Sequence, residues 1–297
     1  MSPERCPICG CFAKVLFEAV DENHRVGLTR FPYAKCDGCQ TIFLTRIPND
    51  IARYYETTYY EIPSPTKLKK LAAKNRGRIN TVLKFARRGR LLEIGPAYGV
   101  FALQAKEAGF EVDALEMDVR CCEYLEKVVG VNAIRSNTPH AAIENLGQHN
   151  VIALWHVLEH LAEPLALLGA VSANLAPGGI LVIGVPNPQA LQFRLMGRHW
   201  PHLDAPRHAI LIPARTLSST LRSFGVREIH RTSNDAEIRY WNRFGWERLL
   251  MNRFSNNRVR SLMRVLGFAL GVASSPLECQ DLRGSAYTAV FQKDSSA

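Results

Sequence analysis

The sequence predicts an α/β protein in which a seven-stranded, mainly parallel sheet follows a small module containing two cysteine pairs. Two C-x-x-C pairs near the start of the chain define the module. From residue 90 onward, short apolar strands alternate with helical segments, which is the pattern of βαβ units. The first of these strands ends in a loop with two glycines, as strands of ligand-binding α/β sheets often do.

The strands of the predicted sheet are short apolar runs. They lie at residues 90–94, 110–116, 131–135, 150–155, 180–185, 226–231 and 286–292. Residues 177–179, Pro-Gly-Gly, are expected to end one helix and to turn the chain into the fifth strand.

Composition excludes some classes of protein. The 297 residues include 47% apolar residues, enough for a normal core, and 37 Lys and Arg against 27 Asp and Glu. The resulting net charge of +10 favours anionic partners without identifying one. Residues 1–5 lack the charged and then apolar pattern of a secretory signal, so we expect a cytoplasmic protein. No apolar run approaches the roughly 20 residues that cross a bilayer.

The cysteine pairs predict a metal site. Cys6 and Cys9 form the first pair, and Cys36 and Cys39 form the second after a gap of 26 residues. Two residues between thiolates let one turn direct both sulfurs at one ion, and two such turns complete a tetrahedral shell. Disulfides are the alternative, but a cytosolic location favours metal. We therefore predict an N-terminal zinc ribbon over residues 1–48, with a structural zinc because its shell is closed.

A linker is expected between the ribbon and the main domain. Residues 49–89 contain four closely spaced tyrosines, Tyr54, Tyr55, Tyr59 and Tyr60. A basic helix with one apolar side is predicted over residues 66–86. The main domain then covers residues 90–297.

The first strand of the main domain leads into the loop Gly95-Pro96-Ala97-Tyr98-Gly99. Its two glycines would let a ligand approach the backbone at the carboxyl edge of the sheet, where open α/β sheets bind ligands. Twenty-one residues after Gly95, the second strand ends in Glu116, which could accept hydrogen bonds from both hydroxyls of a ribose. Dinucleotide-binding folds use a similar loop, so the loop alone does not identify the ligand.

Three further features separate the chain from dinucleotide-binding proteins. The spacing G-x-G-x-x-G is absent because position 97 is Ala, Glu93 lies inside the first strand, and the fourth strand runs into Trp155-His156-Val157-Leu158-Glu159-His160. Together these resemble class I S-adenosylmethionine-dependent methyltransferases, which have a Rossmann-like seven-stranded sheet. The last block, with residues 175–179 and 185–187, is similar to the branch called methyltransferase domain 23. Members of that branch often carry a similar zinc ribbon.

The resemblance implies a set of cofactor-binding residues. The methionyl part of S-adenosylmethionine would lie against Glu93, Gly95, Ala97 and Gly99. Glu116 would hold the ribose, and Met117 would pack on the adenine. Asn137 stands near the end of the third strand, where the family often has an acidic residue facing the adenine amino group, and we expect it to substitute.

Histidines are the candidate catalytic residues. Methyl transfer is an in-line displacement, so the protein must align a nucleophile and exclude water, and a hydroxyl nucleophile also benefits from a base. Histidine titrates near neutral pH. Five histidines follow the fourth and fifth strands: His156, His160, His199, His202 and His208. We favour His208 as the base, with His156 and His160 as alternatives.

A metal-dependent variant of this chemistry is also open. Glu159, His160 and His208, with or without His156, could hold a divalent metal, as in some methyltransferases with a Glu-x-x-Glu-His motif. This chain has His156 where that motif begins with Glu.

Three functions therefore compete. The leading hypothesis is methylation of a hydroxyl or carbon of a sugar, glycan or secondary metabolite. RNA methylation is suggested by the ribbon and the net charge of +10, but the fourth strand lacks the Asn/Asp-Pro-Pro-Tyr signature of many base-methylating enzymes. The third hypothesis is a non-catalytic zinc-ribbon adaptor, against which the intact Gly95, Gly99 and Glu116 argue.

Residues 232–280 are predicted to form a helical lid over the active site. Within them, Arg253, Arg258, Arg260 and Arg264 precede a short apolar stretch. In a lid the arginines would point outward, and the inward side chains would be Leu262, Met263, Leu266 and Leu270. The alternative is that this stretch makes peripheral contact with an anionic membrane surface.

Overall fold

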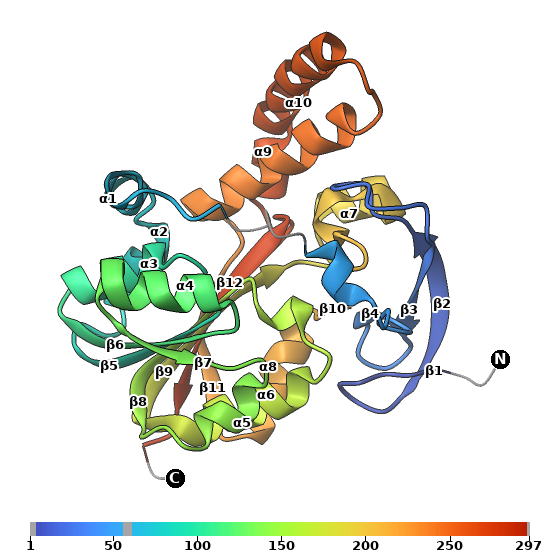
Figure 1. Cartoon of the computed structure of the whole chain (residues 1–297). Helices are drawn as coiled ribbons and strands as arrows, with labels where there is room; N and C mark the ends of the chain where they lie inside the picture. Colours follow the sequence, from blue (N-terminus) through green and yellow to red (C-terminus); the bar gives the residue numbers. More distant parts are fainter. Residues whose placement is uncertain (1–3, 56–60, 296–297) are drawn as a thin grey trace.

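The computed structural model describes residues 4–55 and 61–295 of the chain and contains two sheets (Figure 1). Tyr59 and Tyr60 of the predicted linker lie outside the described residues. The larger sheet is built from β5 (Gly89–Ile94), β6 (Phe110–Glu116), β7 (Asn132–Arg135), β8 (His149–Trp155), β9 (Leu175–Pro186), β11 (Val226–Thr232) and β12 (Ala286–Lys293).

The order of strands in this sheet is β11-β12-β9-β8-β5-β6-β7. All pairs from β9 to β7 are parallel, whereas β12 runs antiparallel to both of its neighbours. The predicted seven-stranded α/β sheet is therefore confirmed. Because β5 pairs in parallel with both β6 and β8, the carboxyl ends of these three strands lie at the same edge of the sheet.

Two layers of helices cover the sheet (Figure 1). One layer consists of α1 (Pro65–Lys74), α2 (Gly77–Leu83), α3 (Val100–Glu107) and α4 (Val119–Tyr124), the last running into a single π-helical turn, η2 (Leu125–Val129). The other consists of α5 (Pro139–Ile143), α6 (Pro164–Asn174) and α8 (Ala214–Ser223). Alternate strand residues feed two separate cores: Leu91 packs in the first layer and Leu92 in the second, as the pleat requires.

Two local predictions are wrong. The expected continuous helix over residues 66–86 is broken, because Asn75 leaves helical geometry after α1 and α2 begins only at Gly77, both being poor helix formers. Residues 177–179 do not separate a helix from a strand but lie within β9, beside a register shift opposite His149. Gly178 has a φ of +72° there, which is typical of an irregular strand position.

The smaller sheet joins the N-terminal module to the main domain. Its strands are β1 (Glu4–Arg5), β2 (Phe12–Ala19), β3 (Phe31–Cys36), β4 (Ile42–Leu44) and β10 (Ile210–Leu211), in that order. The fifth strand comes from the main domain: Ile210 pairs with Phe43 and Leu211 with Ile42. The module is thus attached to the rest of the chain by strand pairing as well as by the linker.

Short helical turns surround this junction. They are η1 (Ile51–Tyr54) at the start of the linker, η3 (Leu158–His160) after β8, and α7 (Leu191–Met196), η4 (Gly197–His199) and η5 (Pro201–Leu203) between β9 and β10. Phe31, Tyr54 and Trp200 contribute to a third core that packs the module against this segment.

The region predicted as a lid is a helical hairpin of α9 (Ala236–Met251) and α10 (Asn257–Glu278), which projects from the body of the molecule (Figure 1). The expected inward packing of its leucines is wrong: Leu262 is 57% exposed, and Leu266 and Leu270 are each 45% exposed. The reason is that α10 uses a different, glycine-containing face to contact α9. Among the described residues, no helix is long and apolar enough to cross a membrane.

Candidate active site and zinc site

The loop between β5 and α3 is held in a left-handed conformation. Gly95, Ala97 and Gly99 have φ values of +67°, +52° and +80°. A Cβ atom on Gly95 would lie 2.6 Å from Val157 Cγ2, and one on Gly99 would lie 2.5 Å from Leu125 Cδ2. Glycine is therefore required at positions 95 and 99 by the positive φ and by the neighbouring side chains. This is a second reason for these glycines, besides the close approach of a ligand that the sequence predicted.

Glu116 joins two loops at the carboxyl edge. Its Oε2 accepts a hydrogen bond from the Ala97 amide at 2.9 Å, and its Oε1 accepts from the amides of Met117 and Asp118 at 2.7 and 3.0 Å. A carboxylate offers about four acceptor positions, so a ribose hydroxyl could still bind. Met117 is 66% exposed beside it, as a residue that packs on a ligand ring would be. Asn137 is exposed beyond the end of β7.

Glu93 is a buried carboxyl group at the end of β5. Burial raises its pKa to about 8, while the nearby Arg78 acts in the opposite direction. Its Oε2 is buried and has no hydrogen-bond partner within the described part of the chain. A buried acceptor without a partner is expected to have a ligand, and a cationic group would suit it. The site therefore fits the positively charged methionyl end of S-adenosylmethionine.

An ion pair that the sequence did not reveal lies next to Glu93. Arg78 of α2 donates from Nε to Glu237 Oε2 of α9 at 2.8 Å, and its guanidinium lies 5.2 Å from the centre of a Trp155 ring. This pair connects the base of the helical hairpin to α2, beside Trp155 at the end of β8. Arg78 is one of many basic residues before β5, so nothing in the sequence singled it out.

His156 occupies a strained backbone position directly after β8. Its φ is +57°, which is uncommon for a residue with a side chain. The amide bonds to Gly184 O at 2.8 Å, and the ring Nδ1 lies 3.1 Å from Glu159 Oε1. Such outliers cluster at functional sites when the surrounding structure maintains them.

His160 and His208 lie together, with their ring centres 4.6 Å apart. The Nδ1 atom of His160 is 3.1 Å from Arg207 O and 2.9 Å from Tyr55 Oη, and Nδ1 of His208 is 2.8 Å from His202 O. A carbonyl only accepts, so both Nδ1 atoms carry a hydrogen, and the proton acceptor of a neutral ring with this tautomer is Nε2. Burial, reinforced by His208, lowers the pKa of His160 to about 4, so this ring is neutral at pH 7.

Glu159 completes a group of three potential ligands with these histidines. One ligand atom from each of the three residues lies within 4.8 Å of the others. Burial alone would raise the pKa of Glu159, but the hydrogen bond with His156 and the nearby histidines lower it. Its Oε2 lacks a hydrogen-bond partner among residues 4–55 and 61–295. The predicted His156, His160 and His208 are thus brought to one place, with Glu159 between them.

The other two histidines have structural partners. His199 bonds to Glu22 of the module, and His202 Nε2 lies 2.9 Å from Trp241 O. Burial lowers the pKa of His202 to about 3, so it stays neutral. Neither is a good candidate for the base.

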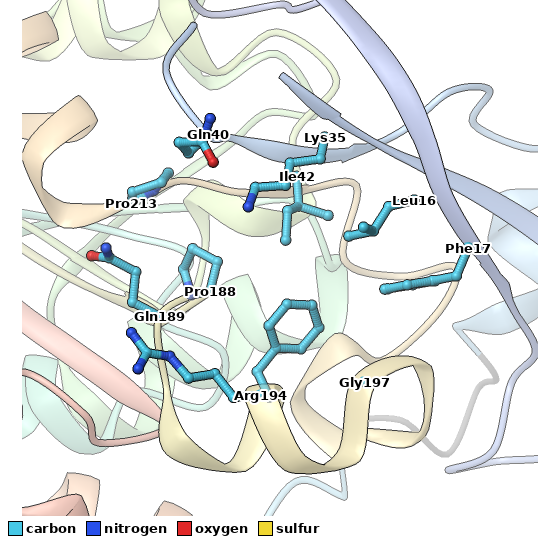
Figure 2. A pocket seen from close by; sticks show the side chains of 11 residues that line it. Leu16, Phe17, Lys35, Gln40, Ile42, Pro188, Gln189, Arg194, Gly197 and Pro213 are labelled. Carbon is cyan, nitrogen blue, oxygen red and sulfur yellow. The ribbon is translucent and has the colours of Figure 1, made fainter. Parts of the chain in front are cut away.

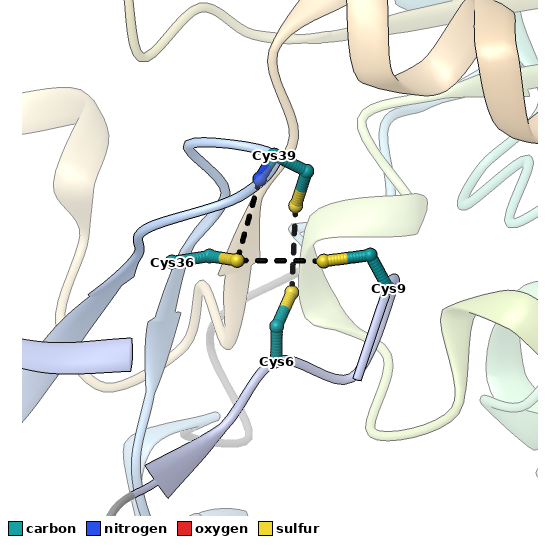
Figure 3. A group of neighbouring side chains, drawn as sticks. All are labelled: Cys6, Cys9, Cys36 and Cys39. Atoms are coloured by element: carbon teal, nitrogen blue, oxygen red, sulfur yellow. Dashed lines mark hydrogen bonds between the residues drawn. The ribbon is translucent and has the colours of Figure 1, made fainter. Parts of the chain in front are cut away.

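The four predicted zinc ligands converge on one point (Figure 3). Cys9 and Cys36 have their sulfurs 3.4 Å apart, and those of Cys6 and Cys39 are 3.5 Å apart. All are free cysteines, so the alternative disulfide framework is not formed. Four thiols around one centre fit a zinc ion of roughly 2.3 Å Zn–S distance and leave no open position for catalysis.

A cavity of about 390 Å³ lies where the module meets the main domain (Figure 2). Phe17 and Ile42 line it from the module, and Phe193 and Arg194 from α7. None of the predicted cofactor-binding residues lines it. The cavity is therefore separate from the glycine loop and is formed jointly by both parts of the chain.

Comparison with known proteins agrees with this geometry. The methyltransferase domain family model matches residues 67–230, which is more than half of the chain. A ubiquinone biosynthesis O-methyltransferase of Cereibacter sphaeroides is 29% identical over 117 residues, covering 37% of this chain and 47% of that protein. The match thus spans about half the length of such curated relatives.

Solved structures show the same fold. A SAM-dependent methyltransferase from Archaeoglobus fulgidus has a TM-score of 0.52 at 18% identity, covering 75% of this chain and 94% of its own. An O-methyltransferase family protein from Burkholderia thailandensis has a TM-score of 0.51 at 12% identity, covering 84% and 64%. The chain therefore belongs to the methyltransferase domain family, and its four-cysteine site can hold zinc.

Proposed function

We propose that this enzyme methylates a hydroxyl group of a sugar, glycan or secondary metabolite. The observation that carries the proposal is the pair His160 and His208, whose Nδ1 atoms are bound to backbone carbonyls and whose Nε2 atoms are left to accept a proton. The names of the curated relatives, O-methyltransferases of ubiquinone biosynthesis, support oxygen as the methylated atom.

In this proposal His208 acts as the general base. Its Nε2 would take the proton of the acceptor hydroxyl as that oxygen becomes the nucleophile. The imidazolium that forms is stabilised by the buried carboxylate of Glu159. Glu93, Glu116 and the glycine loop hold the methyl donor, which supplies the electrophilic methyl group.

The test compares two histidine variants. His208→Ala should lower turnover by roughly 10²–10⁴-fold, the usual contribution of a general base, while leaving the affinity for S-adenosylmethionine within a few-fold. His199→Ala is the matched control, because His199 contacts Glu22 instead of this cluster. The acceptor is identified by incubating the enzyme with methyl-labelled S-adenosylmethionine and extracts of the host, and then profiling the labelled products. Equal turnover in wild type and His208→Ala would refute the role of His208.

The side chains of Glu159, His160 and His208 could also bind a divalent cation, which would give a second mechanism. The Oε2 atom of Glu159, which has no hydrogen-bond partner among the described residues, favours it. A bound cation would lower the pKa of a coordinated hydroxyl instead of accepting its proton. Treatment with EDTA distinguishes the two mechanisms. The zinc content is measured in parallel, because loss of zinc from the four-cysteine site could also lower turnover. Turnover that is lost and then restored by Mg²⁺ or Mn²⁺, with zinc unchanged, would support the cation.

A further inference from the structure

The α9–α10 hairpin is held together by small residues on one face of α10. A Cβ atom on Gly267 would lie 2.5 Å from Glu247 Cα, and one on Gly271 would lie 3.0 Å from Arg243 Cα. Gly267, Gly271 and Glu278 are the buried residues of α10. The large apolar side chains of this helix are therefore not needed for its packing on α9.

These apolar side chains cover the opposite face of α10. At 100° per residue they form a broad surface on the side away from the two glycines. They are between 45% and 62% exposed: Leu262, Val265, Leu266, Phe268, Leu270, Val272 and Leu277. No charged residue occurs from Val265 to Leu277. An apolar surface of this length is normally covered by a partner.

The charged residues of the stretch that carries this face are all positive. From Arg248 to Leu277 the chain contains five arginines and no Asp or Glu. Arg253, Arg258 and Arg264 are exposed at or near the turn between the two helices. A second copy of the chain would bring two such positive segments together, which is unfavourable. An anionic surface with an apolar interior matches both the arginines and the leucines.

We propose that the hairpin, residues 236–278, binds the surface of an anionic membrane. α10 lies in the plane of the membrane, with its apolar face at the boundary of the acyl chains and the turn arginines paired with lipid phosphates. The helix rests on the bilayer and does not cross it, since it is too polar to span. Glu237, at the base of the hairpin, pairs with Arg78 of α2, so the hairpin is anchored to the body of the molecule at the end opposite the turn.

The experiment is flotation of the zinc-loaded, full-length protein with vesicles. Vesicles of phosphatidylcholine and phosphatidylglycerol should carry the protein upward, those of phosphatidylcholine alone should do so weakly, and salt should reduce binding. Leu266→Ser with Leu270→Ser should reduce binding at least tenfold. Arg258→Gln with Arg264→Gln should remove the preference for anionic lipid.

A matched control removes two exposed positive charges elsewhere. Lys69→Gln with Lys70→Gln on α1 should bind vesicles like wild type, and circular dichroism should show that all variants are folded. Binding that persists in both hairpin variants would overturn the proposal. So would absence of vesicle binding together with a dimer that dissociates when Leu266 and Leu270 become Ser, because the face would then cover a second copy.

Discussion

Arg207 and Asp21 form a buried ion pair across 186 residues of sequence, with 2.7 Å between Arg207 Nη2 and Asp21 Oδ1. Asp204 Oδ1 lies at 2.7 Å from the same nitrogen. Although burial opposes their ionisation, hydrogen bonds from Arg207 hold the pKa of Asp21 and of Asp204 below the usual range. Asp21 belongs to the N-terminal module and Arg207 to the main domain, so a charge network fixes their junction.

Replacing Arg207 with Met should lower the free energy of unfolding by roughly 3–5 kcal/mol, because two carboxylates lose their buried counter-ion. Denaturant unfolding of the zinc-loaded protein measures this change. Arg215→Met is the control, since Arg215 is exposed on α8. The difference in unfolding free energy between wild type and Arg207→Met should shrink below about pH 4. The reason is that Asp21 and Asp204 stabilise the folded state through Arg207 only while their carboxyl groups are ionised. A pH-independent difference would contradict this account.

Cofactor affinity should increase with pH through Glu93. Burial raises the pKa of this group to about 8, so the free enzyme carries a proton there at pH 7, and a cationic ligand favours the ionised form. Affinity should then rise by up to about tenfold per pH unit below pH 8 and level off above it. Calorimetry in buffers of different ionisation enthalpy should detect proton release on binding. Glu93→Gln should abolish both effects; if it does not, another group is responsible.

The substitution Glu116→Ala removes the carboxylate and should weaken S-adenosylmethionine binding by roughly 1.5–3 kcal/mol, the scale of hydrogen bonds to a charged acceptor. Glu111→Ala, an exposed change on the same strand, should leave affinity unchanged. Gly95→Val should be more damaging than Glu116→Ala, because of its positive φ and the contact with Val157. Calorimetric titration gives both affinities. Unchanged binding in both variants would mean that the cofactor lies elsewhere.

Purified protein should contain about one zinc per chain, and Cys36→Ser should release it because three ligands do not close the shell. Cys11→Ser is the control: Cys11 is exposed beside the cluster and is not one of the four convergent cysteines. Cofactor affinity should largely survive the loss of zinc. Elemental analysis that finds no metal in protein prepared without chelator would exclude the site.

Local patterns account for what the sequence predicted well. Runs of apolar residues located each strand of the large sheet to within a few residues, except the irregular start of β9. The glycine loop and the two cysteine pairs were visible because their chemistry depends on residues close in sequence. The sequence also predicted that His160 and His208 lie close together, because each follows a strand that ends at the same edge of the sheet.

Long-range pairs could not be found in this way. Arg78 and Glu237 are 159 residues apart, and neither lies in a distinctive pattern. The pairing of β10 with β4 involves two residues of the main domain, too few for a strand signal. The leucines of α10 were assigned inward because their spacing reveals an apolar face but not what covers it.

The pairing of β10 with β4 also determines the order in which the molecule can be completed during synthesis. The ribosome makes the cysteine module first, yet the partner of its last strand, residues 210–211, follows about 165 residues later. Until then the edge of β4 has unsatisfied backbone groups that any other strand could pair with. The edge of β4 therefore stays open to pairing with other strands until residues 210–211 have been made.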